Sequence, residues 1–554
     1  MASIAERSMH YPWRTGASAF DVGCVLLAAA SIAAGIYLRA TQLSTQILVD
    51  DEWHAIHKLL HSDVKGIVTS FGVADYSIPL TLYYRFLALH GGLTEWQMHL
   101  PMLLAGSALL VACPWLLRRD APPAALAAWG ALLAISPLLV YLSRTARPYA
   151  ITCLLAFVAV IAFRNALDAR SHAKAWGSTY AFCTVLAGWL HLVTLPFTLL
   201  PFVFYAMAAV RKRRDDPRAQ VIRRLVYLGA STAIPLAVVL APPLAASATQ
   251  LALKAGADGI TPQSTLRTAL MLFGVASPAL LGACVALCAI GAYRHARRDA
   301  SFVGYVGFLC AGTAVAIAAA RPQWIQHPLV YARYLLPALP FALLFVAEGA
   351  VALVGWLRPA AFAPAALALG AVLLYEAGPI PGYLYRPNQF MGHARFQFDY
   401  DPAHNPYVQE IPRDPMPAFY RSLAQRPAAS LTLIEAPWRL ESNFIPFPWY
   451  QQVHRQYIRI GLVTPVCGVR DFGEYPAAGT GLDFRYFVHL SEILAGRRYG
   501  ADYLVMHLTP WKTPPDAAVE WPDVAACLPT IAAKLGAPSY RDDSIVVFDL
   551  RAAR

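Results

Sequence analysis

Hydrophobic and polar positions divide the chain into two parts. Up to about residue 378, long apolar runs alternate with short polar or basic connectors. About 20 consecutive apolar residues are needed to cross the hydrocarbon core of a bilayer, and runs near that length predict eleven membrane spans. They are expected at about 22–40, 98–117, 122–142, 149–167, 176–191, 193–210, 225–246, 269–292, 301–320, 334–355 and 360–377.

Beyond residue 378 the pattern is that of a small α/β domain. Three short apolar runs predict buried strands, at Ser430–Ile434, Ala501–Met506 and Ser544–Leu550. Two longer runs predict helices, at Tyr450–Leu462 and Val524–Leu535. We therefore expect residues 1–377 to form a membrane domain and residues 378–554 a layered α/β domain.

The connector at 41–97 is too long and too rich in aromatic and charged residues to be a simple link. Its stretches Trp53–Leu60 and Leu80–Leu89 have helical spacing with aromatic faces, which is typical of helices lying at a membrane interface. The predicted fold class is a polytopic α-helical membrane protein with about eleven spans, amphipathic outer-loop helices and a small C-terminal α/β domain.

Composition and charge agree with this division. The 554 residues are 57% hydrophobic and only 14% charged, with a net charge of +12. The densest basic run, residues 211–224, lies between two predicted spans, which indicates a topology signal rather than nucleic-acid binding. With the N-terminus inside, 18 lysine and arginine residues fall in inner connectors and 10 in outer ones. The positive-inside rule therefore predicts a cytoplasmic N-terminus, and an odd number of spans places the C-terminal domain outside.

Two further features concern processing and redox state. The first apolar run, at about 22–38, lacks a small-residue cleavage site, so it is predicted to be an uncleaved first span. Of nine cysteines, only Cys467 and Cys527 lie in the C-terminal domain. An extracytoplasmic domain would allow a disulfide between them, but the residues alone favour two unrelated thiols.

Two outer segments carry residues capable of chemistry. Asp50, Asp51 and Glu52 are three consecutive carboxylates just past the first span, and their mutual repulsion favours a cation, a metal or a substrate proton nearby. The competing interpretation is a solvated helix N-terminus. Arg144 and Arg147 occupy a short outer connector, where guanidinium groups are suited to binding phosphate or simply to the membrane interface.

A third outer segment repeats the pairing of arginine with aromatic residues. Arg321 and Arg333 lie at predicted outer membrane edges, Tyr334 follows directly, and His191 ends another span. A lone histidine in that position is more often structural. Asp399 and Asp401 form a DxD pattern, but without a nucleotide-binding context we expect no metal site there.

Four segments in this order resemble the integral-membrane GT-C glycosyltransferases, in the bacterial branch related to aminoarabinose transferases and protein mannosyltransferases. They are Asp51-Glu52 after the first span, 75–80 (DYSIPL), 143–149 (SRTARPY) and 331–340 (YARYLLPALP). The resemblance covers about residues 20–377. The chain departs from the family at Ser77-Ile78-Pro79, where His-Pro-Pro is usual, and at His99, where an arginine is common.

The resemblance implies a GT-C-like fold and transfer of a hexosyl or pentosyl group from a polyprenyl-phosphate sugar to an acceptor hydroxyl of a lipid or glycan, on the periplasmic face of a bacterial inner membrane. The implied catalytic residues are Asp51, Asp50, Glu52 and Asp75. The implied donor-phosphate ligands are Arg147, Arg333, Arg321 and Arg144, and the implied substrate contacts are Tyr149, Tyr334, His191 and Tyr76. The resemblance implies no particular cofactor and leaves open a divalent cation, with which the acidic cluster is compatible. A monomer in the bilayer is expected.

Two other functions fit a polytopic membrane protein. A transporter or flippase would place charges inside the spans, where Glu348 and Glu376 are the exceptions to an otherwise uncharged interior. A ligase or polymerase of lipid-linked glycans would share the donor class but would not need Asp51.

Overall fold

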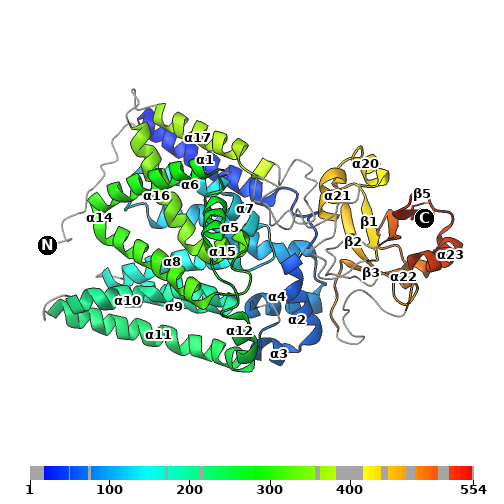
Figure 1. Cartoon of the computed structure of the whole chain (residues 1–554), viewed down its shortest axis with the longest axis horizontal. Coiled ribbons are helices and arrows are strands. Elements are labelled where there is room, and N and C mark those ends of the chain that lie inside the picture. Colours follow the sequence, from blue (N-terminus) through cyan, green and yellow to red (C-terminus); the bar gives the residue numbers. More distant parts are fainter. Residues whose placement is uncertain are drawn as a thin grey trace.

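The computed structural model describes residues 18–48, 50–72, 76–168, 172–211, 216–275, 277–355, 362–381, 416–437, 447–468, 481–509 and 523–551. Long helices lie side by side at one end of the molecule, and the C-terminal sheet lies at the other (Figure 1). Three short helices of the first connector, α2 to α4, lie between them. We call the end of the helical part that carries these short helices and the sheet its outer end.

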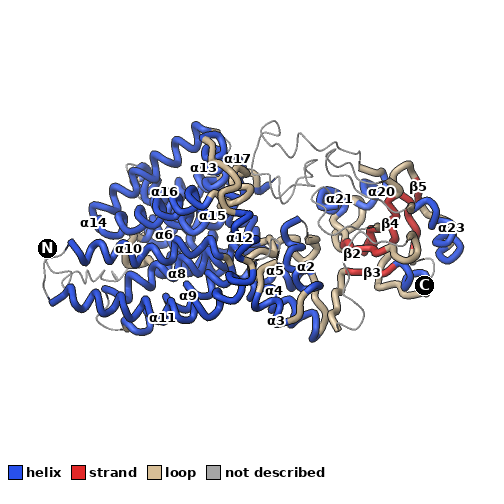
Figure 2. Tube along the Cα trace, turned by 60° about the horizontal axis from the view of Figure 1, so that its bottom comes forward, coloured by secondary structure: helices blue, strands red, loops and turns tan. Residues whose placement is uncertain are grey.

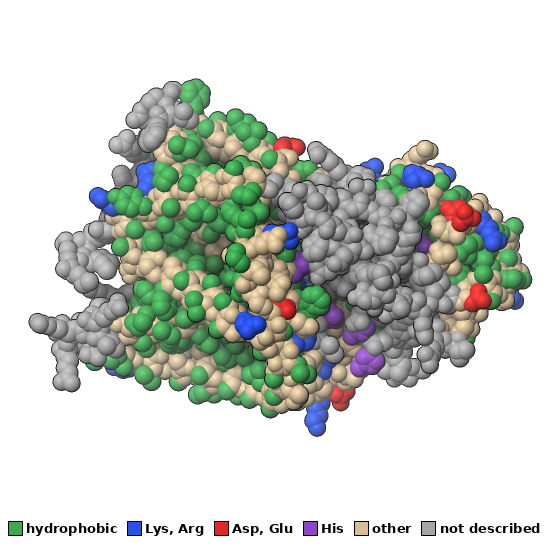
Figure 3. All heavy atoms as spheres, in the orientation of Figure 1, with side chains coloured by type: hydrophobic (Ala, Val, Ile, Leu, Met, Phe, Trp, Pro, Cys, Tyr) green, Lys and Arg blue, Asp and Glu red, His purple; other side chains and the backbone are tan. Residues whose placement is uncertain are grey.

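The helical part is built from apolar helices. Its longer helices are α1 (Ala19–Ala40), α5 (Glu95–Leu116), α6 (Pro123–Ile135), α8 (Tyr149–Asp168), α9 (Ala173–Leu190), α10 (Leu195–Arg211), α11 (Asp216–Ala246), α14 (Pro278–Ala320), α16 (Leu339–Val354) and α17 (Ala363–Ala377). Among the described residues, seven helices are long and apolar enough to cross a membrane, or eight if α6 and α7 (Pro137–Ser143), bent by 57°, count as one span. Hydrophobic side chains cover the flank of this part, whereas charged side chains lie at its ends and on the C-terminal domain (Figure 3).

Shorter elements lie at the outer end. They are η2 (Asp50–Trp53), α2 (His54–His61), α3 (Val64–Thr69), α4 (Ile78–His90), η3 (Leu192–Thr194), α12 (Ala248–Lys254), α13 (Pro262–Phe273), α15 (Pro328–Leu335) and η4 (Leu336–Ala338). The two helices predicted within residues 41–97 are thus confirmed as α2 and α4.

The span predicted at 269–292 is wrong at its start. Residues up to Phe273 belong to α13, which ends at Gly274 in the left-handed region (φ 67°), and a new helix begins at Pro278. Glycine just past a helix and proline in the first turn of the next are the usual signals for such a break. Helix α14 then runs to Ala320 with non-helical backbone at Asp299. At 1.5 Å per residue its 43 residues extend about 65 Å, twice a hydrocarbon core, so the break at Asp299 divides it as two spans require. The total of eleven spans stays a prediction.

The C-terminal domain is a six-stranded sheet covered on both faces. Its strands are β1 (Thr432–Ala436), β2 (Tyr457–Leu462), β3 (Phe487–His489), β4 (Tyr503–His507), β5 (Tyr540–Arg541) and β6 (Ile545–Asp549), in the order β3-β2-β1-β4-β6-β5. The first four strands in this order are parallel, and β6 is antiparallel to both β4 and β5. Four helices complete the domain, at α20 (Ala418–Leu423), α21 (Phe447–His454), α22 (Leu490–Leu494) and α23 (Val524–Leu535).

The three predicted strands are confirmed within two residues, as β1, β4 and β6, and so is the helix α23. The helix predicted at Tyr450–Leu462 is wrong beyond His454, because residues 457–462 form β2. Ile458 and Ile460 of β2 are buried between β1 and β3. Their alternation has the two-residue period of a strand. The apolar spacing that predicted a helix is therefore helical only up to His454.

The expectation of two unrelated thiols is also wrong, since Cys467 and Cys527 form a disulfide. The bond lies in the core on the sheet face covered by α23, with Leu504, Met506 and Ile531. Disulfides persist in oxidising compartments, so this contact agrees with an extracytoplasmic domain.

Replacing both cysteines by serine should destabilise the C-terminal domain. The bond closes a loop with a sequence separation of 60, and losing such a constraint lowers the free energy of unfolding by about 4 kcal/mol. The temperature at which the domain becomes protease-sensitive in the intact chain measures this. Cys284→Ser, which removes a thiol of α14, serves as the control. An unchanged temperature in the double variant contradicts a structural role for the bond.

Candidate active site

The loop at 144–148, between α7 and α8, is the first component of the site. Arg144 is buried, and its guanidinium donates to the carbonyl oxygens of Leu38 (3.2 Å), Arg39 (3.1 Å) and Thr41 (2.6 Å). The last carbonyls of a helix have no partner within the helix, so Arg144 caps α1. It also donates to Oε1 of Gln46 at 3.1 Å, and the Gln46 amide donates to the Arg144 carbonyl at 2.9 Å. This geometry assigns Arg144 to holding the loop against α1.

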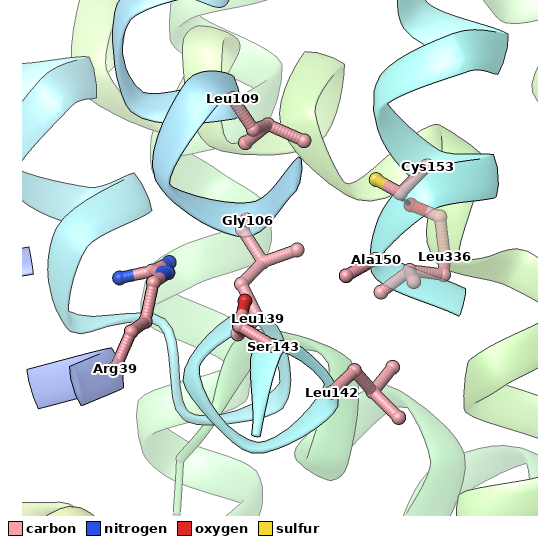
Figure 4. A pocket seen from close by; sticks show the side chains of 9 residues that line it. All are labelled: Arg39, Gly106, Leu109, Leu139, Leu142, Ser143, Ala150, Cys153 and Leu336. Atoms are coloured by element: carbon pink, nitrogen blue, oxygen red, sulfur yellow. Dashed lines mark hydrogen bonds between the residues drawn. The ribbon is translucent and has the colours of Figure 1, made fainter. Parts of the chain in front are cut away.

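A small cavity lies behind this loop (Figure 4). It is lined by side chains that include Arg39 of α1, Ser143 of α7 and Cys153 of α8, and it has room for one water-sized sphere, about 10 Å³. A Cβ atom at Gly106 of α5 would lie 1.9 Å from Oγ of Ser143. Glycine at this position therefore allows α5 to approach the start of the loop. The cavity is too small for a sugar or a phosphate.

Glu52 joins the acidic segment to the arginine loop. Its side chain is fully buried, and Oε1 accepts hydrogen bonds from the backbone N–H of Ala146 (2.6 Å) and from Nε2 of His99 (3.0 Å). A buried carboxylate is stable only when such bonds replace its hydration. Asp51 directly precedes Glu52, and Arg147 directly follows Ala146. The contact between Glu52 and Ala146 therefore brings these two parts of the backbone together. His99, a departure from the family pattern, is thus the side-chain partner of Glu52.

Arginine and aromatic residues from three places meet beside this loop. The guanidinium of Arg333, in α15, lies 5.2 Å from the ring centre of Tyr149 and 5.7 Å from that of Tyr334. The His191 ring, between α9 and η3, lies 5.1 Å from Tyr149 and 5.9 Å from Tyr334. Arg147 and Arg333 both act electrostatically on His191. We call these five residues the arginine cluster. Two guanidinium groups beside aromatic faces form a positive region suited to a phosphate and to a sugar or prenyl chain.

The remaining predicted residues form a second group. Lys254 lies 5.5 Å from the ring of Tyr76, which packs against Phe71 at 5.4 Å. Arg321 is exposed at the end of α14 and donates through Nε to the carbonyl of Asp258 at 3.2 Å. The backbone of 254–257 is bonded to that of 320–323. Arg321, which follows α14, and Tyr76 therefore both lie beside the segment 254–258.

Part of the predicted acidic site lies outside the described residues. This holds for Asp75 and for the side chains of Asp50 and Asp51, while the backbone of Asp50–Trp53 forms the short helix η2. Within the described part of the chain, no group of three or more His, Cys, Asp or Glu side chains could hold a metal ion. Asp399 and Asp401 also lie outside that part.

Sequence reasoning did not assign roles to two residues that the geometry brings into the site. His99 was noted only as a departure, although a polar residue inside a predicted span is itself a signal for a buried partner. Gln46 had no such signal, because polar residues in outer connectors are common.

Comparisons with known proteins find similar solved structures but no match in sequence. No protein-family model matches the chain, and no curated protein matches it in sequence. Among solved structures, the chain is similar to the crystal structure of ArnT from Cupriavidus metallidurans bound to undecaprenyl phosphate, with 14% identity, 95% of this chain and 97% of that chain covered, and a TM-score of 0.46.

Two further structures are similar over most of this chain. The oligosaccharyltransferase of Archaeoglobus fulgidus shows 13% identity, with 88% of this chain and 69% of that chain covered and a TM-score of 0.42. The arabinofuranosyltransferase AftD from Mycobacteria shows 13% identity, with 95% of this chain and 40% of that chain covered and a TM-score of 0.42.

The Glu52–His99 pair yields a prediction about stability. Glu52→Ala should lower the free energy of unfolding by about 2–4 kcal/mol, because it leaves the Ala146 N–H and the His99 imidazole buried without their acceptor. Adding His99→Leu to Glu52→Ala should cost less than the sum of the two single changes. Thermal unfolding followed by a thiol-reactive dye suits this test, since Cys113, Cys153 and Cys183 are buried. Strictly additive losses contradict the pairing.

Proposed function

We propose that the protein is a glycosyltransferase that moves a sugar from a polyprenyl-phosphate carrier to an acceptor hydroxyl at the outer face of the membrane. The hydrogen bond from Ala146 to Glu52 is the observation that carries the proposal. It brings the acidic segment to within one residue of Arg147, and Arg147 lies with Arg333 around His191. An acidic segment next to the loop of Arg147, with Arg333 at the outer ends of the apolar helices, would supply a base for the acceptor and cations for a lipid-phosphate leaving group.

The reaction needs a base and a stabiliser of negative charge. The acceptor oxygen attacks the anomeric carbon, its proton passes to a carboxylate, and the bond from that carbon to the phosphate oxygen breaks. Asp51 is the proposed base, with Asp50 as the alternative and Glu52 and Asp75 orienting. The departing phosphate takes the bonding electrons, and Arg147 and Arg333 stabilise its charge. Direct displacement inverts the anomeric centre.

The donor class follows from the position of the arginine cluster. Tyr149 is the first residue of α8, and Arg333 and Tyr334 lie in the last turn of α15, at the outer end of the helical part. A polyprenyl phosphate would keep its chain among the apolar helices and present its phosphate at this depth. The ArnT structure was determined with undecaprenyl phosphate bound, a carrier of the proposed class. The acceptor is a lipid or glycan hydroxyl, and no nucleotide is needed.

The proposed location is a bacterial inner membrane, with the N-terminus cytoplasmic and the C-terminal domain periplasmic. Two observations support this orientation. The outer-end domain contains the disulfide Cys467–Cys527, which needs an oxidising compartment. Basic residues are in excess in the connectors predicted to lie inside.

A transporter would place charged residues inside the spans, as Glu348 and Glu376 are placed, but Glu348 has a structural explanation. Glu348 in α16 is buried and accepts hydrogen bonds from Nδ1 of His295 (2.7 Å) and from Arg298. The carboxylate thus joins α16 to α14 through an ion pair. Glu376 is exposed on α17.

Transfer of label from a panel of radiolabelled polyprenyl-phosphate sugars tests the proposal. Membranes carrying the wild type should form product, and Asp51→Asn should reduce the rate at least about 100-fold, as expected for loss of a general base. Asp63→Asn, an exposed acid of the same connector that caps α3, is the matched control. Survival of transfer in Asp51→Asn moves the base to Asp50 if Asp50→Asn is inactive, and otherwise favours a ligase or polymerase. No product from any donor, with acceptor supplied, refutes the proposal.

The two arginines at the outer edge should differ in their contribution. Arg333→Ala should lower kcat/KM by about 100-fold or more, because it removes a cation from the leaving-group site. Arg321→Ala should change it by less than about tenfold, since Arg321 is exposed and bonded to the backbone of Asp258. Equal losses in the two variants, measured at equal expression, would place Arg321 in the donor site as well.

A further inference from the structure

The C-terminal domain contacts the residue that follows the acidic segment. Trp53, directly after Glu52, is buried against the domain, with its ring 5.8 Å from Tyr486 and 6.2 Å from Phe487. Backbone bonds strengthen this contact, since Leu93 donates to the carbonyl of Asp483 at 2.8 Å and accepts from Arg485 at 3.0 Å. One buried apolar cluster runs from the first connector into the sheet. The outer-loop helices and the sheet thus share a core.

A second contact lies on the other side of the acidic segment. Gln451, in α21, is buried, and its Nε2 donates to the carbonyl of Thr45 at 2.6 Å. Its Oε1 accepts from the backbone N–H of Ile47 at 3.4 Å. One glutamine amide therefore binds the backbone of the first connector twice, a few residues before Asp50.

A third contact lies just before the acidic residues. Leu48 is fully buried and belongs to the same apolar cluster as Ile458 and Ile460 of β2. Ile47 and Leu48 before the acidic residues, and Trp53 after them, are thus each held by contacts with the C-terminal domain.

Helix α21 is itself fixed to the sheet. Glu435, near the end of β1, accepts from the hydroxyl of Tyr420 (2.8 Å) and lies 2.8 Å from Nε2 of His507. The Tyr420 ring stacks on that of Tyr450 at 4.4 Å, and Tyr450 precedes Gln451. Burial, with Glu435 beside it, raises the pKa of Tyr420 well above its usual value, so the hydroxyl stays a neutral donor. Helix α21 lies on the side of the sheet that faces the helical part (Figure 2).

From these contacts we propose that the C-terminal domain positions the acidic segment, with Gln451 and the Tyr486–Phe487 pair holding its two ends. The inference rests on the proposed function, because positioning matters where Asp51 is the base. The segment itself is a four-residue 3₁₀ helix, a type with weak hydrogen-bond geometry that is stable only in short pieces. An error of about 1 Å in the placement of a catalytic group costs about 100-fold in rate. Gln451 is thus a positioning residue, since it acts through the backbone of Thr45 and Ile47.

The first test compares Gln451→Ala with Gln425→Ala in the full-length protein. Gln425 lies exposed in the same domain, just after α20. Gln451→Ala should lower kcat by about 10- to 100-fold, while the KM for the donor stays within about twofold, because the arginine cluster is untouched. The thermal midpoint and the Cys467–Cys527 linked peptide, seen by mass spectrometry, report a folded domain. A kcat within about twofold of the wild type overturns the inference.

The second test does not depend on catalysis. Hydrogen–deuterium exchange of peptides covering residues 45–53 should be faster in Gln451→Ala than in the wild type and unchanged in Gln425→Ala. If the wild type transfers no sugar, the proposed function fails, and the exchange measurement alone decides whether the domain holds this segment. Equal exchange in the two variants overturns the positioning role, whatever the outcome of the transfer assay.

Discussion

The bond from the backbone N–H of Ala146 to the buried carboxylate of Glu52 is the contact on which the arrangement of the site depends. Before folding, the two residues are separated by two predicted spans and a long connector. A buried carboxylate is costly unless its oxygens accept hydrogen bonds, so Glu52 is stable only where Ala146 and His99 meet it. This requirement fixes the acidic segment against the arginine loop, and with it the relation between the proposed base and the proposed phosphate ligands.

The positive-inside rule disfavours arginines in an outer connector, but the partners of Arg144 and Arg147 explain why they are found there. Arg144 occupies the free carbonyls at the end of α1, so its charge replaces a helix cap and holds the loop in place. Arg147, three residues later, contributes instead to the field at His191. Under the proposed mechanism, Arg144 supports the loop and Arg147 stabilises the phosphate, and only their partners distinguish these two arginines.

Much of the fold could be predicted from periodicity, because burial sets the pattern of apolar residues directly. The apolar runs, the helices α2 and α4 and three strands followed from it. The break at Gly274 and the strand β2 did not, since a single glycine or a six-residue alternation is a weak signal within a longer apolar run. The disulfide was missed because spacing along the chain carries no information on spatial distance. In the site, the convergence of Tyr149, His191, Arg333 and Tyr334 could be expected from motif order. The Glu52–His99 pair could not, because it depends on how α5 packs against the first connector.

The proposed phosphate ligands and the proposed base are held by different parts of the structure, the helical part and the C-terminal domain. The arginine cluster lies on α15, on the first residue of α8 and on the loops before α8 and η3, all within the helical part. The acidic segment belongs to a connector whose flanks are bound by Gln451, Tyr486 and Phe487 of the C-terminal domain. Ground-state binding of a lipid phosphate would depend mainly on the helices, whereas the placement of the base would depend on the soluble domain. Under this proposal the C-terminal domain would control the rate of transfer without contacting the donor. The core that the sheet shares with the outer-loop helices would hold the proposed base more accurately than a flexible tether, as proton transfer needs.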